Sequence, residues 1–415
     1  MKTLKKMTVA LSLLGSLSLY SAEVEVLHWW SSGSEAESIG KLKGLLEDSG
    51  HSWKDFSVAG GNGVNAMTVL KSRVIAGNPP SAAQIKGPSI QEWSEIGSTL
   101  NLNDVAKANN WDKIIPERFA QHMKYNGNYV AVPVNVHKIN WMWVNPAIFK
   151  KAGAQIPTTW AQFEVAAKKI KAAGFIPVAA GGQAWQETTM FETIVLGVGG
   201  ADFYNKALVD LDPKALASDT IKKSFDILRM VKAYTDKNAP GRDWNLATSM
   251  VYKNEAAMLF MGDWAKGEFK VAGKKVGIDY VALDTPQTSG SYIYNIDSFV
   301  MFDQKDAKKA VAQKKLAQLI LDKSFQVIFN TKKGSIPISL EAPRKQFDDI
   351  ALRSMDQLNA ASYSKTLVPS MAHQMAITDN LKGVFFDVVT NFYNSKMSSA
   401  EATKILASSI KSEKE

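Results

Sequence analysis

The chain has 415 residues, no cysteine and a formal net charge of +9. The missing cysteine excludes disulfides, thiolate metal sites and cysteine nucleophiles, and it removes the residue that carries the lipid of an amino-terminal anchor. The length exceeds the ~250–300 residues at which one hydrophobic core stops growing, so two domains are predicted.

Residues 1–22 have the pattern of a cleavable signal peptide. Three lysines precede an apolar run that ends near Tyr20. Such a run is too short to span a bilayer comfortably, and this arrangement is typical of secretory leaders. We therefore predict cleavage after Ala22 and a periplasmic protein without a lipid anchor.

The mature charge is +6, because the leader contributes three lysines and no acid (9 − 3). The remaining lysines are scattered along amphipathic segments, for example Lys168, Lys169 and Lys171. Scattered charge is typical of solvated faces, so no nucleic-acid partner is predicted. No later stretch approaches the ~18 consecutive apolar residues of a membrane span.

A predicted strand over residues 23–27 runs directly towards two adjacent tryptophans, Trp29 and Trp30. Ligands bind at the carboxyl ends of the strands in open α/β sheets. Neighbouring side chains of a regular strand point to opposite faces, whereas both can reach a cleft at a strand end. Because a flat indole covers the apolar face of a pyranose well, the pair favours sugar recognition. The alternative is one core tryptophan and one partly exposed tryptophan.

Glu35 lies at the start of a predicted helix over residues 34–48. Ser34 opens this helix and Glu37 follows three residues on, a spacing that predicts a capping box. Two roles for Glu35 stay equally open. An acid in the first helical turn is favoured by the helix dipole, and a carboxylate facing a cleft can accept hydrogen bonds from two sugar hydroxyls.

A glycine-rich turn follows the second predicted strand, residues 55–59. Gly61–Ala66 matches the loose G-x-G-x-x-[GA] pattern of dinucleotide sites, but Lys86 stands where that motif needs an acid. We therefore predict a tight turn that faces a cleft, with amides that can touch a ligand. A helix ending near Gly77 and a third strand over 82–86 are predicted to follow.

Further along, strands and helices alternate, which predicts an α/β fold. Thr159 is the candidate cap of a helix that stops at Gly174. The other predicted elements are a turn at Asn126–Gly127, an extended segment over 130–144, a strand over 176–180, helices up to about 260, a strand over 299–302, one helix over 305–331 and a helix from Ser398.

Asn295 and Asp297 place two polar side chains on the same face of a short predicted strand. Polar residues that share a face among strand-forming residues are unusual in a buried strand and fit the wall of a polar pocket. Exposure of that face to solvent is the alternative, with roughly equal weight.

No metal or other cofactor is predicted. The histidines have no partner at metal-ligand spacing; they are His28, His51, His122, His137 and His373. A glycosidase pair, such as Glu35 with Asp297, stays open, because its carboxylates would need a separation of roughly 5–9.5 Å that a sequence does not give.

Eight segments, spread in order over the mature chain, resemble the periplasmic glucose-binding proteins of carbohydrate ABC importers. Among them are HWWSSGSEAE, GNPPSAAQIKG, YVAVPVNVHKINWMWVN, FMGDWAKGEF, YNIDSFVMF and VPSMAHQMA. These proteins belong to the type II extracellular solute-binding proteins, which include the maltose-binding protein. The motifs IPTTWAQF and KKGSIPI complete the resemblance.

The resemblance implies a two-lobed α/β fold with hinged lobes and crossing connections. It implies an amino-terminal lobe of residues 23–134 plus 299–343 and a carboxy-terminal lobe of 135–298 plus 344–415. The sugar-contacting residues that it implies are Trp29, Trp30, Glu35, Lys86, Trp264, Asn295, Asp297, Lys333 and His373. Asn135 and His137 lie on a crossing segment and are further candidates.

We therefore expect a monomeric periplasmic receptor that binds glucose and delivers it to the membrane subunits of an ABC permease without catalysis. Two alternatives remain: a binding protein of the same fold for another monosaccharide or a disaccharide, and a secreted glycosidase that uses Glu35 and Asp297.

Overall fold

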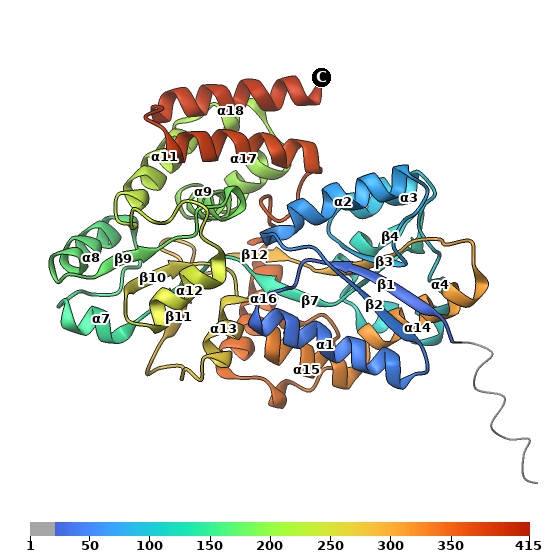
Figure 1. Cartoon of the computed structure of the whole chain (residues 1–415). Coiled ribbons are helices and arrows are strands. Elements are labelled where there is room, and N and C mark those ends of the chain that lie inside the picture. The colour runs from blue at the N-terminus through green and yellow to red at the C-terminus, as the bar shows by residue number, and fades with distance from the viewer. Residues whose placement is uncertain (1–20) are drawn as a thin grey trace, which may run out of the picture.

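The computed structural model of the protein describes residues 21–415. Figure 1 shows two bodies, with strands running between them. Each body has a hydrophobic core of its own, and helices surround three sheets of four or five strands. The α/β fold class is therefore confirmed. The predicted signal peptide, 1–22, lies almost wholly outside the described residues.

The amino-terminal lobe is built on a five-stranded sheet in the order β2-β1-β3-β13-β6. Strand β1 runs parallel to β2 and β3, and β13 is antiparallel to β3 and β6. The elements are β1 (Glu23–His28), α1 (Gly33–Asp48), β2 (Ser52–Ser57), η1 (Gly61–Gly63), α2 (Val64–Ile75), β3 (Ala82–Ile85), α3 (Pro88–Glu95), α4 (Asn103–Ala108), α5 (Trp111–Ile114), α6 (Glu117–Ala120), η2 (Gln121–Met123), β4 (Lys124–Tyr125), β5 (Asn128–Tyr129), β6 (Ala131–Pro133), β13 (Ser298–Met301), α14 (Ala307–Ile320) and α15 (Lys323–Lys333).

The carboxy-terminal lobe is built on a four-stranded sheet in the order β11-β8-β10-β9. Strand β10 is parallel to β9 and antiparallel to β8. The elements are β8 (Trp141–Val144), α7 (Pro146–Lys151), α8 (Trp160–Ala172), β9 (Ile176–Ala179), α9 (Ala184–Tyr204), η3 (Asn205–Val209), α10 (Pro213–Leu216), α11 (Asp219–Lys232), α12 (Trp244–Tyr252), β10 (Ala256–Phe260), α13 (Ala265–Val271), β11 (Val281–Asp284), α17 (Asp379–Asn394) and α18 (Ser399–Lys414).

A third sheet connects the two lobes. Its strand order is β14-β7-β12-β15, and β7 and β12 lie between the two bodies in Figure 1. Helix α16 contributes Ile350 to the core of the carboxy-terminal lobe and Met355 to that of the amino-terminal lobe. The remaining elements are β7 (Asn135–Lys138), β12 (Tyr292–Asn295), β14 (Ile336–Pro337), η4 (Arg344–Gln346), α16 (Asp349–Ser364) and β15 (Leu367–Pro369).

Local sequence signals account for many element ends. Thr159 caps α8 in a capping box with Gln162, as the sequence predicts at that cap. Asn126 has a φ of 49° in the turn between β4 and β5, a left-handed conformation that asparagine tolerates. Ser398 caps the last helix. Among the described residues, no helix has the length and apolar character needed to cross a membrane.

Two predictions about helices are wrong. Helix α1 matches the predicted helix to within one residue, but the predicted capping box is absent because no side chain caps its start; the Ser34 hydroxyl instead donates to Glu268 in the other lobe. The single helix over 305–331 is two helices, because Asp322 accepts hydrogen bonds from the amides of Ser324 and Phe325 and starts a new helix.

Two strands also differ from the sequence pattern. Strand β2 covers Ser52–Ser57, earlier than the predicted 55–59. Strand β10, Ala256–Phe260, falls at the end of a region that is predicted to be mostly helical, and all of its residues are buried. A short, fully buried apolar run has no alternation that separates a strand from a helix.

The connecting sheet contains a fully buried lysine, Lys138. Its Nζ pairs with Asp284 and lies 2.8 Å from Gln357 Oε1. Burial lowers the pKa of Lys138 to about 8, although the Asp284 charge opposes this shift. The Asp284 carboxylate therefore stabilises the charge of the Lys138 ammonium, which is buried away from water.

We expect Asp284→Asn to lower the free energy of unfolding by about 3 kcal/mol, because it leaves the buried Lys138 charge without its partner. Chemical denaturation at pH 7 measures this change. Asp226→Asn, which alters an exposed pair with Lys222, is the matched control and should change stability by less than about 0.5 kcal/mol. Equal effects in the two variants would contradict this role of the pair.

Candidate functional site

A cleft with a volume of about 200 Å³ lies between the two lobes. Both lobes and the connecting sheet contribute to its lining. All the residues predicted as sugar contacts line it: Trp29, Trp30, Glu35, Lys86, Trp264, Asn295, Asp297, Lys333 and His373. The structure thus brings together side chains that are far apart in the sequence.

The two adjacent tryptophans follow directly after β1, at the carboxyl end of that strand. Both are largely buried and both line the cleft. Trp30 also packs against the core, with its ring 5.2 Å from that of Phe329. Trp29 lies over Gly63, where a Cβ would come within 2.6 Å of the indole. A glycine with a φ of 78° therefore leaves room for this ring.

Glu35 and Lys333 form a buried ion pair across helix ends. Glu35 lies in the first turn of α1, and Lys333 is the last residue of α15. Their Oε1 and Nζ atoms are 2.7 Å apart, and the second carboxylate oxygen accepts a hydrogen bond from Ser32 Oγ at 3.1 Å. The pair places an acceptor and a donor side by side at one wall of the cleft.

Asp297 lies between β12 and β13. Gln84 Nε2 donates to its Oδ1 at 3.3 Å, and His137 Nε2 lies 2.9 Å from its Oδ2. Burial alone would raise the pKa of Asp297, but the hydrogen bond and charge of His137, with the charges of Lys86 and Lys333, hold it well below the ordinary value. Asp297 is therefore an ionised acceptor.

Lys86 follows β3 and is held by Asn62 in the turn before α2. Its Nζ donates to Asn62 Oδ1 at 2.8 Å and lies 5.0 Å from the centre of the Trp29 ring. Burial lowers the pKa of Lys86 to about 8, while the Asp297 charge opposes this shift. Lys86 is thus mainly a charged donor at neutral pH.

Asn295 has a buried polar atom without a hydrogen-bond partner. Among the predicted sugar contacts, all of which lie within residues 21–415, it is the one residue with such an atom. The residue is 2% exposed, and its Oδ1 is buried without a hydrogen-bond partner. Buried polar atoms are nearly always paired, and leaving one unpaired costs about 1–3 kcal/mol. Asn295 lines the cleft, but this oxygen is covered by protein in the closed arrangement, so it can meet a ligand only if the side chain or the lobes move.

His373 is carried by a loop that a buried acid holds in place. Glu192 on α9 accepts hydrogen bonds from Ser370 Oγ at 2.7 Å, Met371 N at 2.8 Å and Ala372 N at 3.1 Å. Burial raises the pKa of Glu192 to about 7. Burial and the charge of Lys86 hold the pKa of His373 well below its ordinary value, so the ring is neutral.

The lobes touch each other across the cleft. Asn62 Nδ2 donates to Ala372 O at 2.7 Å, and Asn62 Oδ1 lies 3.1 Å from His373 Nδ1. On another side, the Ser34 amide and hydroxyl both donate to Glu268 Oε1, at 3.1 and 2.8 Å. The structure is therefore the closed arrangement of the two lobes.

Several lining residues were missed by sequence reasoning, among them Asn62, Trp185, Asp243, Trp244 and Asn245. Trp185 and Trp244 lie at the first turns of α9 and α12. The sequence signal that could have identified Trp185 and Trp244 as lining residues is a tryptophan at the start of a helix. Trp29 and Trp30 have a similar position, just before α1. His137, a further candidate in the sequence, also lines the cleft, whereas Asn135 supports Asp297 from behind with a hydrogen bond of 3.3 Å.

Comparison with known proteins gives consistent matches. Residues 47–323 match the family described as "Bacterial extracellular solute-binding protein". A "Probable sugar-binding periplasmic protein" of Rhizobium meliloti (strain 1021) is 44% identical over 407 residues, 98% of each chain. A protein of the same description from Brucella melitensis is 45% identical and covers 94% of this chain and 92% of its own.

Solved structures with low sequence identity share the fold. A "Chitin oligosaccharide binding protein" has a TM-score of 0.82 at 17% identity and covers 94% of this chain and 98% of its own. A bacterial solute receptor described as exclusively preferring b-D-galactopyranose has a TM-score of 0.80 at 18% identity, with 94% and 99% coverage. The two-lobed architecture predicted from the sequence is thus confirmed.

Gly61 should control how closely the lobes approach. A Cβ at this position would lie 2.3 Å from Nε1 of Trp185 in the other lobe, so we expect Gly61→Ala to hold the lobes apart. Small-angle X-ray scattering should give a larger radius of gyration than for Gly44→Ala, whose added Cβ meets nothing within 4 Å. Equal radii for the two variants would show that the contact does not limit closure.

Proposed function

Because this chain belongs to the bacterial extracellular solute-binding proteins, we propose that it is a periplasmic sugar receptor whose cleft binds glucose. The lobes close on the monosaccharide, and the closed form delivers it to the membrane subunits of an ABC importer. The family is one of solute-binding proteins rather than enzymes, and the relatives described as sugar-binding span nearly the whole chain.

The observation that carries the proposal is the convergence of charged side chains and indole rings from distant parts of the chain on one cleft between the lobes. The cleft offers acceptors on Glu35 and Asp297 and donors on Lys86 and Lys333. Hydrogen bonds to charged partners are stronger than neutral ones, and a hydroxyl can both donate and accept.

The indole rings supply the apolar half of the site. Trp264 lies 5.1 Å from the His373 ring, centre to centre, and lines the cleft with Trp29 and Trp30. Each stacked ring contributes about 0.5–1.5 kcal/mol beyond the area that it buries. A ring with flat CH faces and a rim of hydroxyls matches both halves of the lining.

The size of the cleft favours one sugar ring. Its volume of about 200 Å³ is below the ~300–1,000 Å³ of pockets that hold drug-sized molecules. A monosaccharide therefore suits this closed form better than a disaccharide does.

We propose that the protein performs no catalysis. A glycosidase needs one carboxyl group that is protonated near neutral pH so that it can donate to the leaving oxygen. The pKa of Asp297 is held well below its ordinary value, which favours an acceptor. Glu35 is tied to Lys333 by the ion pair, which supports the same role.

The remaining parts of the proposal concern assembly and location. We propose that the protein is a monomer, that residues 1–22 direct its export to the periplasm, and that no lipid anchors it. The lobes are proposed to be 23–134 plus 299–343 and 135–298 plus 344–415. They would hinge about the connecting sheet, since β7 and β12 carry the chain between them (Figure 1).

Calorimetry against a panel of monosaccharides tests the ligand. We expect binding heat with glucose and an affinity at least about tenfold lower for galactose and mannose, because an epimer leaves one buried partner unpaired. If glucose gives no binding heat and another sugar does, glucose is the wrong ligand and the other sugar takes its place in the proposal. If the protein hydrolyses a glycoside and Glu35→Gln abolishes this turnover, the protein is a glycosidase and the proposed receptor function is wrong.

Trp264→Ala should weaken glucose binding by about tenfold or more, because it removes a stacking ring from the cleft. Calorimetry gives the affinity, and tryptophan emission on addition of glucose gives a second readout. Trp93→Phe, on α3 and packed against Phe302, is the control and should bind like the unaltered protein. Unchanged affinity in Trp264→Ala would remove this residue from the site.

A further inference from the structure

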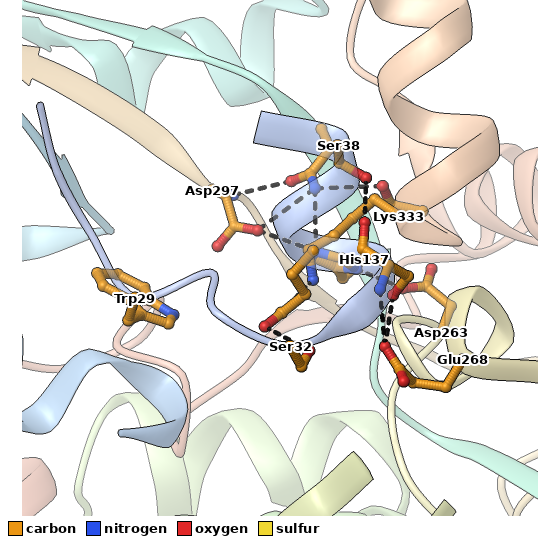
Figure 2. Close-up of polar contacts among 12 residues, drawn as sticks. Trp29, Ser32, Ser38, His137, Asp263, Glu268, Asp297 and Lys333 are labelled. Carbon is orange, nitrogen blue, oxygen red and sulfur yellow. Dashed lines mark hydrogen bonds and ion pairs between the residues drawn. The ribbon is translucent and has the colours of Figure 1, made fainter. Parts of the chain in front are cut away.

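One imidazole, that of His137 on β7, lies between two carboxylates that come from different parts of the chain. Its Nδ1 faces Asp263 Oδ1, and its Nε2 lies 2.9 Å from Asp297 Oδ2. The ring is 1% exposed. Figure 2 shows it among the polar contacts of the cleft, with Asp263 and Asp297 on its two sides.

Both ring nitrogens must donate in this arrangement. An ionised carboxylate only accepts hydrogen bonds, so each nitrogen that faces one needs a proton. Asn135 Nδ2 is also 3.0 Å from His137 Nε2. Its two hydrogens have oxygen acceptors in Ser335 Oγ at 3.2 Å and Asp297 Oδ2 at 3.3 Å, so it does not require a lone pair on the imidazole.

The bridge reaches two groups of the proposed sugar site at once. Asp263 directly precedes Trp264, and its Oδ2 accepts from the Lys138 amide at 2.9 Å. The Trp264 indole packs edge-on against the His137 ring, with centres 5.3 Å apart. Asp263 itself does not line the cleft, so any effect of Asp263 on a ligand must pass through His137 or through the backbone next to Trp264.

We infer that His137 is a positioning residue of this site: its doubly protonated ring holds the Asp297 acceptor and the Trp264 platform in one arrangement across the connecting sheet. The inference rests on the proposed function. His137 has no polar atom left for the sugar, because both nitrogens are used by protein carboxylates. It acts through Asp297 and Trp264 rather than by contact.

The inference gives a pH dependence whose sign follows from the surrounding charges. Burial alone would lower the pKa of His137, but Asp263 and Asp297 raise it above the ordinary value. The bridge therefore survives to higher pH than the charge of a free imidazole would, and it is lost as pH rises through that raised pKa. The other charges facing Asp297 are Lys86 and Lys333, and the pKa of Lys86 is about 8. Sugar affinity is therefore expected to fall at alkaline pH for two reasons, deprotonation of His137 and deprotonation of Lys86. A variant is needed to separate these two contributions.

Nitrogen NMR of the histidine side chains in the sugar-free protein tests the bridge directly. We expect His137, assigned by its loss in His137→Gln, to show both ring nitrogens protonated at pH 7, while His373 shows a neutral ring. A neutral His137 at pH 7 would overturn the inference. This measurement does not depend on which sugar binds, so it stands even if glucose fails to bind.

Asp263→Asn tests the positioning role without altering a residue that lines the cleft. We expect glucose affinity to fall roughly tenfold at pH 7, and the alkaline loss to begin at lower pH, because His137 has lost one of its two stabilising charges. Glu187→Gln, which alters another buried acid of the same lobe paired with Asn394, is the control and should leave the pH profile unchanged.

The outcomes separate the two proposals. Circular dichroism and thermal unfolding confirm that each variant is folded before binding is measured. If Asp263→Asn binds glucose with the affinity and pH profile of the unaltered protein, the positioning role is wrong. If the unaltered protein binds no monosaccharide while the NMR result holds, the proposed function fails and the bridge is only structural.

Discussion

The burial of charged side chains between the lobes is the constraint on which the rest of the structure depends. Lys86, Lys333, Glu35 and Asp297 come from four separate parts of the chain, and each is less than a tenth exposed. An isolated buried charge is prohibitively costly, so each needs partners that lie elsewhere in the chain. The strand ends and helix ends that carry these residues must therefore meet at one place, and the connecting sheet holds them there.

Much of this site is visible in the sequence because its residues follow regular elements. Trp29 and Trp30 come after a strand with a clear pattern. The ligand-binding edge of an α/β sheet is set by strand direction, so this pair can be assigned to that edge from the order of strands and helices alone. Family motifs then supply the partners that periodicity does not reach, such as Lys86, Lys333 and His373.

The parts that sequence reasoning missed depend on contacts between the lobes. Asn62 looks like a turn residue, and only the approach of Ala372, 310 positions away, makes it an interlobe contact. The same holds for the predicted capping box at Ser34, whose hydroxyl serves a partner 234 positions away. Local propensity cannot anticipate a competing hydrogen-bond partner from the other half of the molecule. The sequence pattern therefore predicted the local capping box in place of the contact between the lobes.

The contact between Ser34 and Glu268 also has an evolutionary consequence. In the proposed opening of the lobes, the first turn of α1 and one carboxylate return to water, so the strength of this contact would add to the balance between the open and closed forms. Glu268 does not line the cleft. Natural variation at this position can therefore tune how long a captured molecule is retained while leaving the chemistry of its recognition untouched.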